Sequence, residues 1–132
     1  MINFPERLAT DLASSLDGVS VYSNVDPTRE WNGAKTVEIN TNSTQRTPLI
    51  SSGFYVDYNV VIACRAGTYD DANTLANTIM GALFTVLRTY KSTNVVLDWA
   101  FTSQDVQPDV LGINEGASFY GLINITLTTR EV

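Results

Sequence analysis

Two segments of the chain show the apolar spacing of an amphipathic helix. In residues 4–17 a leucine recurs every four positions, at Leu8, Leu12 and Leu16. In residues 69–90 aliphatic side chains recur at intervals of three and four. Such spacing places the apolar residues along one stripe of a helix, and the stripe requires a partner surface. Both segments are therefore predicted to be helices that pack against a sheet.

Five other segments alternate apolar and polar residues, as strands with one buried face do. They are residues 19–22, 35–40, 53–65, 95–101 and 119–128. The order is therefore helix, three strands, helix, two strands. Because strands dominate and the later links are long, the sequence predicts an α+β fold: a mainly antiparallel sheet of about five strands, with two helices packed on one face. With no internal repeat, residues 1–132 are expected to form a single α+β domain.

Two polar stretches interrupt this pattern. Residues 41–48 have neither apolar side chains nor periodicity, which predicts a projecting loop or a segment that a partner orders. Residues 102–116 are predicted to be a long polar loop, and Trp31 lies in a third polar stretch, either as a satellite core residue or as an interface anchor. The candidate interface residues are Trp31, Asn42, Thr44, Gln45, Arg46, Gln104, Asp105, Asp109 and Asn114.

Composition narrows the class of protein. With 132 residues, 44% apolar and 17% charged, the chain is expected to be an ordinary soluble globular domain, with no secretory signal and no apolar run that could cross a membrane. Eight basic against fourteen acidic residues give a net charge of -6. This sign is wrong for a protein that holds nucleic acid by neutralising phosphates, so any DNA nearby is expected to pass without binding.

The residues available for chemistry make an enzyme unexpected. The chain has no histidine and one cysteine, Cys64, which removes the usual general base and the usual zinc ligands. Cys64 lies on the apolar face of a predicted strand and is expected to be buried and inert. The acidic residues Asp105, Asp109 and Glu115 lack the spacing of a calcium loop. We expect no cofactor and no metal.

The stretch from Thr68 to Asp71 has two interpretations. Adjacent aspartates beside a glycine turn suggest a catalytic carboxylate pair. However, threonine followed three positions later by an acidic residue has the spacing of a capping box at a helix start. Neighbouring helical residues also point about 100° apart, which suits capping better than paired catalysis. The sequence therefore favours a helix cap.

The order of these segments carries a family resemblance. The short strand at residues 19–22 is followed by a polar excursion, a long strand, and a helix that opens with Asp71-Ala72 and continues through Leu75-Ala76, Ile79 and Leu83. A last strand then includes Tyr-Gly-Leu-Ile-Asn-Ile-Thr at residues 120–126. In this arrangement nearly the whole chain resembles the tail terminator (tail completion) proteins of long-tailed bacteriophages.

The resemblance implies a structural virion protein. Members of that family form a hexameric ring that caps the tail tube, ends its elongation and offers the surface for head-tail joining. The partners implied are copies of the chain, the tail tube protein and the head-tail connector protein, while DNA passes through the lumen without specific binding. The location implied is the neck region of the virion tail, after assembly in the host cytoplasm. The two polar loops and Trp31 are the expected contact regions.

Other functions are also compatible with the sequence. Another head-tail connector or minor tail protein would share the same layout. A different class, a small ligand-binding α+β domain, would place a mostly apolar pocket between helix and sheet. An enzyme ranks behind both.

Overall fold

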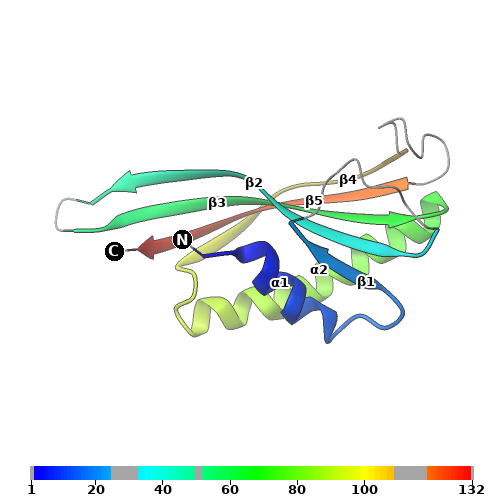
Figure 1. Cartoon of the computed structure of the whole chain (residues 1–132), viewed down its shortest axis with the longest axis horizontal. Coiled ribbons are helices and arrows are strands. Elements are labelled where there is room, and N and C mark those ends of the chain that lie inside the picture. Colours follow the sequence, from blue (N-terminus) through cyan, green and yellow to red (C-terminus); the bar gives the residue numbers. More distant parts are fainter. Residues whose placement is uncertain (1, 25–32, 50–51, 109–118, 132) are drawn as a thin grey trace.

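The protein is seen in a computed structural model that describes residues 2–24, 33–49, 52–108 and 119–131, with the backbone alone for residues 102–108. The chain runs from one short helix through three strands to a long helix and two further strands (Figure 1). The elements are α1 (Phe4–Ala13), β1 (Ser20–Ser23), β2 (Thr36–Pro48), β3 (Phe54–Ala66), α2 (Tyr69–Ser92), β4 (Asp98–Pro108) and β5 (Phe119–Glu131).

The five strands form one sheet in the order β1-β2-β3-β5-β4. The β1–β2 pair is parallel, and the other three pairs are antiparallel. Both helices cover the same face of the sheet (Figure 1). The predicted α+β fold, with its element order and mainly antiparallel sheet, is therefore confirmed.

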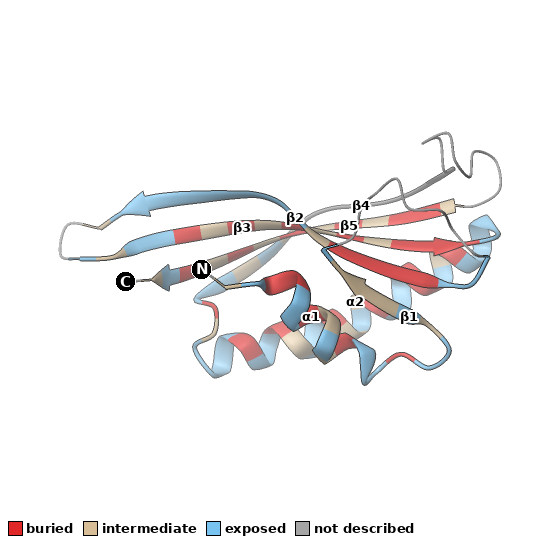
Figure 2. Cartoon of the chain, in the orientation of Figure 1, coloured by how far each residue is buried: buried red, intermediate tan, exposed pale blue. Residues whose placement is uncertain are grey.

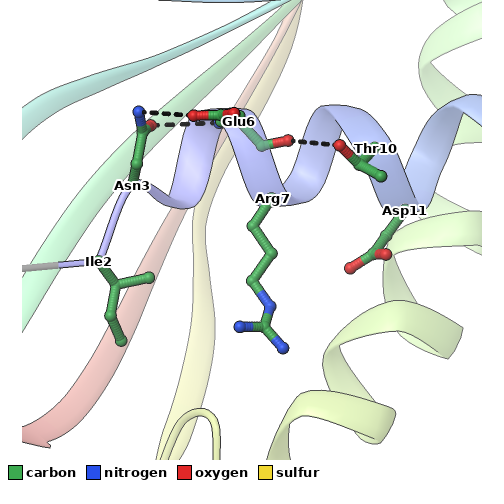
Figure 3. A pocket seen from close by; sticks show the side chains of 6 residues that line it. All are labelled: Ile2, Asn3, Glu6, Arg7, Thr10 and Asp11. Atoms are coloured by element: carbon green, nitrogen blue, oxygen red, sulfur yellow. Dashed lines mark hydrogen bonds between the residues drawn. The ribbon is translucent and has the colours of Figure 1, made fainter.

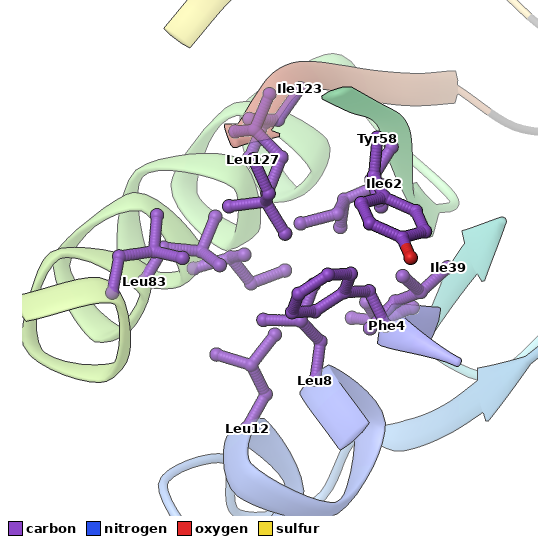
Figure 4. Close-up of a cluster of buried hydrophobic side chains, with 14 of the residues drawn as sticks. Phe4, Leu8, Leu12, Ile39, Tyr58, Ile62, Leu83, Ile123 and Leu127 are labelled. Atoms are coloured by element: carbon purple, nitrogen blue, oxygen red, sulfur yellow. The ribbon is translucent and has the colours of Figure 1, made fainter. Parts of the chain in front are cut away.

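The core lies between the helices and this face of the sheet (Figures 2 and 4). Phe4, Leu8 and Leu12 bring the buried stripe of α1 into it. Ile79, Leu83 and Leu87 do the same from α2. The strands contribute every second residue, including Val37, Ile39, Val56, Tyr58, Val60, Ile62, Cys64, Ile123, Ile125 and Leu127. The apolar area that the helices and the sheet remove from water in this core is the main contribution to the stability of the fold.

Helix α1 begins where the sequence predicts but ends earlier. The Asn3 side chain accepts a hydrogen bond from the Glu6 N–H and caps the helix, and Pro5 occupies its first turn. The α-helix ends at Ala13, not at the predicted position 17. Leu16 is buried nevertheless, because hydrogen bonds from the Ser15 N–H to the Leu12 carbonyl and from the Leu16 N–H to the Ala13 carbonyl continue the turn beyond the helix.

Two tyrosines attach the N-terminal segment to the rest of the fold. The Tyr90 hydroxyl donates to the Asp11 carboxylate, and burial together with this acceptor raises the pKa of Tyr90. The Tyr58 hydroxyl donates to Glu131 and accepts from the Ile2 N–H. Burial would raise the pKa of Glu131, but hydrogen bonds from Tyr58 and Thr129 outweigh it and the pKa is lowered. These contacts join α1 to α2 and to the sheet.

The predicted loop at residues 41–48 is wrong. These residues continue β2, and they pair with β3 as far as Pro48 opposite Phe54. All eight side chains are exposed, so no alternation of buried apolar residues marked the strand. Backbone hydrogen bonds to β3 hold it instead.

The boundaries predicted around β4 are also wrong. Residues 102–108, predicted as the start of a loop, pair with β5 up to Pro108 opposite Phe119. Residues 95–97, predicted as strand, precede β4. The N–H groups of Val95 and Val96 both donate to the Tyr90 carbonyl at the end of α2. The apolar side chain of Val96 enters the core from this turn, which explains the misleading pattern.

Candidate assembly surfaces

The predicted interface residues fall into three groups. Trp31, Asp109 and Asn114 lie outside the described residues. Gln104 and Asp105 belong to β4, where only the backbone is described. The other four, Asn42, Thr44, Gln45 and Arg46, lie together in β2 and are exposed. They are therefore strand residues and not loop residues.

We call residues 41–48 of β2 the β2 arm. With the adjoining half of β3 it projects past α1 (Figure 1). A register shift between Thr41 and Ser43 leaves Asn42 as an extra residue, which is a β-bulge. The arm contributes no side chain to the core, and the Arg46 guanidinium lies 5.7 Å from the ring centroid of half-exposed Phe54.

One edge of the β2 arm has no neighbour among the described residues. Strand β1 pairs with β2 only as far as Ser23 opposite Ile39, so no strand of the described residues pairs with this edge from residue 40 to residue 48. At the opposite side of the sheet, β4 has β5 as its one described neighbour. Open edges present rows of unpaired N–H and C=O groups that can pair with another chain. The described sheet thus has open backbone groups on two different strands.

An aromatic cluster lies beside the β4 edge. Phe84 of α2, Trp99 and Phe101 meet edge to face, with ring centroids 5.2 to 5.6 Å apart. Phe84 is 37% exposed, and the Arg88 guanidinium lies 5.9 Å from its ring. The apolar pattern of the sequence does not predict this cluster. The available signal was a phenylalanine at position 84, outside the apolar stripe of its helix.

A second unforeseen group lies on the sheet face away from the helices. Arg65 is only 2% exposed, and its guanidinium stacks 4.4 Å from the ring centroid of Tyr120. Its neighbours Thr36 and Glu38 are also buried. Among the described residues, no hydrogen-bond partner is found for Thr36 Oγ1, Glu38 Oε1 or Arg65 Nε. The described contact of this buried arginine is therefore its stacking on the Tyr120 ring.

The stretch at the start of α2 is a helix cap. The Thr68 hydroxyl accepts a hydrogen bond from the Asp71 N–H at 3.2 Å. Asp70 and Asp71 lie in the first turn, where the positive end of the helix dipole favours them. This confirms the capping interpretation.

The described residues hold no group of three or more side chains suited to bind a metal ion. The described pockets are open grooves over the helices. The one drawn in Figure 3 is lined by side chains of α1 and of the two residues that precede it. Its polar groups already bond locally: Asn3 donates to the Glu6 carboxylate, and the Thr10 hydroxyl donates to the Glu6 carbonyl. This groove therefore offers few free groups for a ligand.

No protein-family model and no curated protein matches the chain. The assignment of function therefore depends on the surfaces just described. Neither of the two described helices is long and apolar enough to pass through a bilayer.

Cys64 is expected to be unreactive in the folded protein. The side chain is fully buried between the sheet and α2, and burial raises the pKa of its thiol to about 12. Since the thiolate is the nucleophile, labelling by a disulfide reagent at neutral pH should be slow in buffer and fast in denaturing urea. Stoichiometric labelling of the folded protein within minutes would contradict this environment.

Proposed function

We propose that this chain is a structural protein of the tail of a long-tailed bacteriophage. It assembles as a hexameric ring, caps the tail tube, ends tube elongation and provides the surface that joins the tail to the head connector. Its place is the neck of the virion tail, reached after assembly in the host cytoplasm. The observation that carries the proposal is an exposed, apolar-free strand segment with an open edge, the β2 arm.

The β2 arm has the properties of a segment that pairs with another subunit. Isolated polar strand pairs are marginally stable in water, and monomeric proteins usually block open edges with charge, proline or a covering segment. Between residues 40 and 48 the arm has one charged residue, Arg46, and its only proline is the last residue. Pairing with another subunit satisfies the open backbone groups.

A ring also requires that one surface meets a different surface of the neighbour. Edges of β2 and β4 on opposite sides of one sheet supply two such surfaces. An isologous dimer would use the same patch twice and would stop at two copies. Two unlike edges fit a head-to-tail contact between neighbours, and such contacts close into a ring when the rotation from one subunit to the next returns to the first.

The sheet face away from the helices suits a lumen through which DNA passes. Cross-strand hydrogen bonds join its side chains, from Thr128 to Asp57 at 2.7 Å and from Thr126 to Asn59 at 2.9 Å. These four side chains are neutral or acidic. Of the arginines on the same face, Arg65 is buried and stacked on Tyr120, and Arg130, opposite Tyr55, is an exposed cation. With a net charge of -6 on the chain, the four neutral or acidic side chains give phosphates little to bind.

Tube growth in the presence of the protein tests the proposal. The tail tube protein encoded in the same genome as this chain is purified and polymerised in the presence and in the absence of this chain. Tube lengths are measured by negative-stain electron microscopy. Capping predicts shorter tubes that bear a ring at one end and do not grow when more tube protein is added. Unchanged length and growth would contradict capping.

A further inference from the structure

We propose that the ring contact is a backbone pairing in which the open edge of the β2 arm of one subunit adds to the open edge of β4 of the next. The partner is thus a second copy of this chain, and the sheet continues from subunit to subunit. This inference rests on the proposed ring and specifies the two surfaces that close it.

The backbone of the arm points its free groups toward the open edge. The Leu49 N–H donates to the Gly53 carbonyl at 3.1 Å, so Leu49 faces β3. Hydrogen-bonding direction alternates along an antiparallel strand, so the N–H groups of Thr44 and Arg46 face away from β3. On the other side of the bulge, the Ile39 carbonyl accepts from the Asn24 N–H and therefore also faces outward. The arm therefore has donors at its open edge.

The side chains on the two edges can contact one another favourably when the β2 arm of one subunit pairs with β4 of the next. Arg46 is opposite Val56, whose side chain is in the core, so Arg46 lies on the helix-covered face. Trp99 and Phe101 lie on that same face of β4, opposite Leu127 and Ile125. Pairing the edges brings the one charged side chain of the arm beside the aromatic cluster. Arginine on an aromatic face is favourable, and it covers the half-exposed Phe84.

The lengths of the edges also agree. Strand β4 has 11 residues, enough to accept the whole open edge of residues 40–48. The described part of the arm carries no acidic residue and no lysine that would oppose a partner strand. β-Strand addition of this kind gains affinity from main-chain hydrogen bonds and specificity from the flanking side chains.

Thr44→Pro tests the pairing. Proline removes the N–H that faces the open edge and leaves the ladder to β3 intact. We expect the dissociation constant of each contact between subunits to rise about ten-fold. Hexamers are assembled on tube ends, and native mass spectrometry gives the protein concentration at which they dissociate. Thr44→Val keeps the N–H, so it should assemble like the parent chain if the backbone makes the contact. Hexamers that persist in Thr44→Pro as in the parent would overturn the inference and leave the ring proposal standing.

A cross-link covers the case in which Thr44→Pro folds poorly. Gln45 and Ala100 both lie on the sheet face away from the helices, and both are exposed. Chains with Gln45→Cys and chains with Ala100→Cys are mixed, assembled and treated with a short bis-maleimide, while buried Cys64 stays unreactive. Chains with Thr10→Cys, exposed on α1, replace the Ala100→Cys chains as the control. Edge pairing predicts that Gln45→Cys chains cross-link to Ala100→Cys chains and not to Thr10→Cys chains. Rings that form but show equal cross-linking in the two mixtures, or none, overturn the inference. A parent chain that never assembles overturns both proposals.

Discussion

Replacing Phe4 by alanine is expected to destabilise the fold by about 3–5 kcal/mol, the usual loss for a buried phenylalanine. Phe4 is fully buried, and its ring meets Tyr58 edge to face at 4.8 Å. It also lies 6.4 Å from the ring of Tyr90. The truncation therefore leaves a cavity where α1, α2 and β3 meet (Figure 4). Urea unfolding followed by circular dichroism gives the free energy of unfolding.

Tyr69→Ala is the matched control for Phe4→Ala. Tyr69 is likewise the first residue of a helix, but it is 52% exposed and its described ring contact is with Phe119. We expect a loss of about 1 kcal/mol or less. Equal losses for the two variants would contradict the placement of α1 on the core.

Gly121→Val is expected to lower the free energy of unfolding by about 1–3 kcal/mol through overpacking. A Cβ at Gly121 would lie 3.0 Å from the Ala76 Cβ and 3.3 Å from the Ala72 carbonyl oxygen. Both atoms belong to rigid parts of α2, so the helix would have to move away from β5. Denaturant unfolding of the purified variant measures the loss.

Gly81→Ala controls for the loss of a glycine. Gly81 lies inside α2, and a Cβ there would meet no atom within 4 Å. Alanine in a helix interior should stabilise the protein by about 0.5–1 kcal/mol. A valine at position 121 that is as well tolerated as an alanine at position 81 would mean that α2 does not approach the sheet so closely.

The apolar pattern predicted the layers of the fold because burial on one face imposes it. Alternation along β3 and the helical stripe of α2 both correspond to residues that enter the core. For the same reason Cys64 could be placed in the core from the sequence, whereas the cap at Thr68 was located from the local spacing of threonine and aspartate. Where side chains are exposed and contribute nothing to the core, as in residues 41–48, no apolar pattern marks the strand.

The candidate surfaces were harder to predict, because they arise from positions in space. The exposed residues of the arm were chosen for their polarity, but their strand conformation and open edge depend on how far β1 and β3 extend beside them. Phe84 meets Trp99 and Phe101 only once α2 lies over β4 and β5. Likewise, the stacking of Arg65 on Tyr120 depends on the β3–β5 register.

Counting the copies of this chain on a tube end tests the central claim most directly. Short tubes assembled with the protein are isolated, and native mass spectrometry with image classification gives the number and symmetry of bound copies. A closed ring of six copies, with six-fold symmetry and at one end of the tube, is the predicted result. A chain that stays monomeric and unbound at saturating tube concentration would contradict the account.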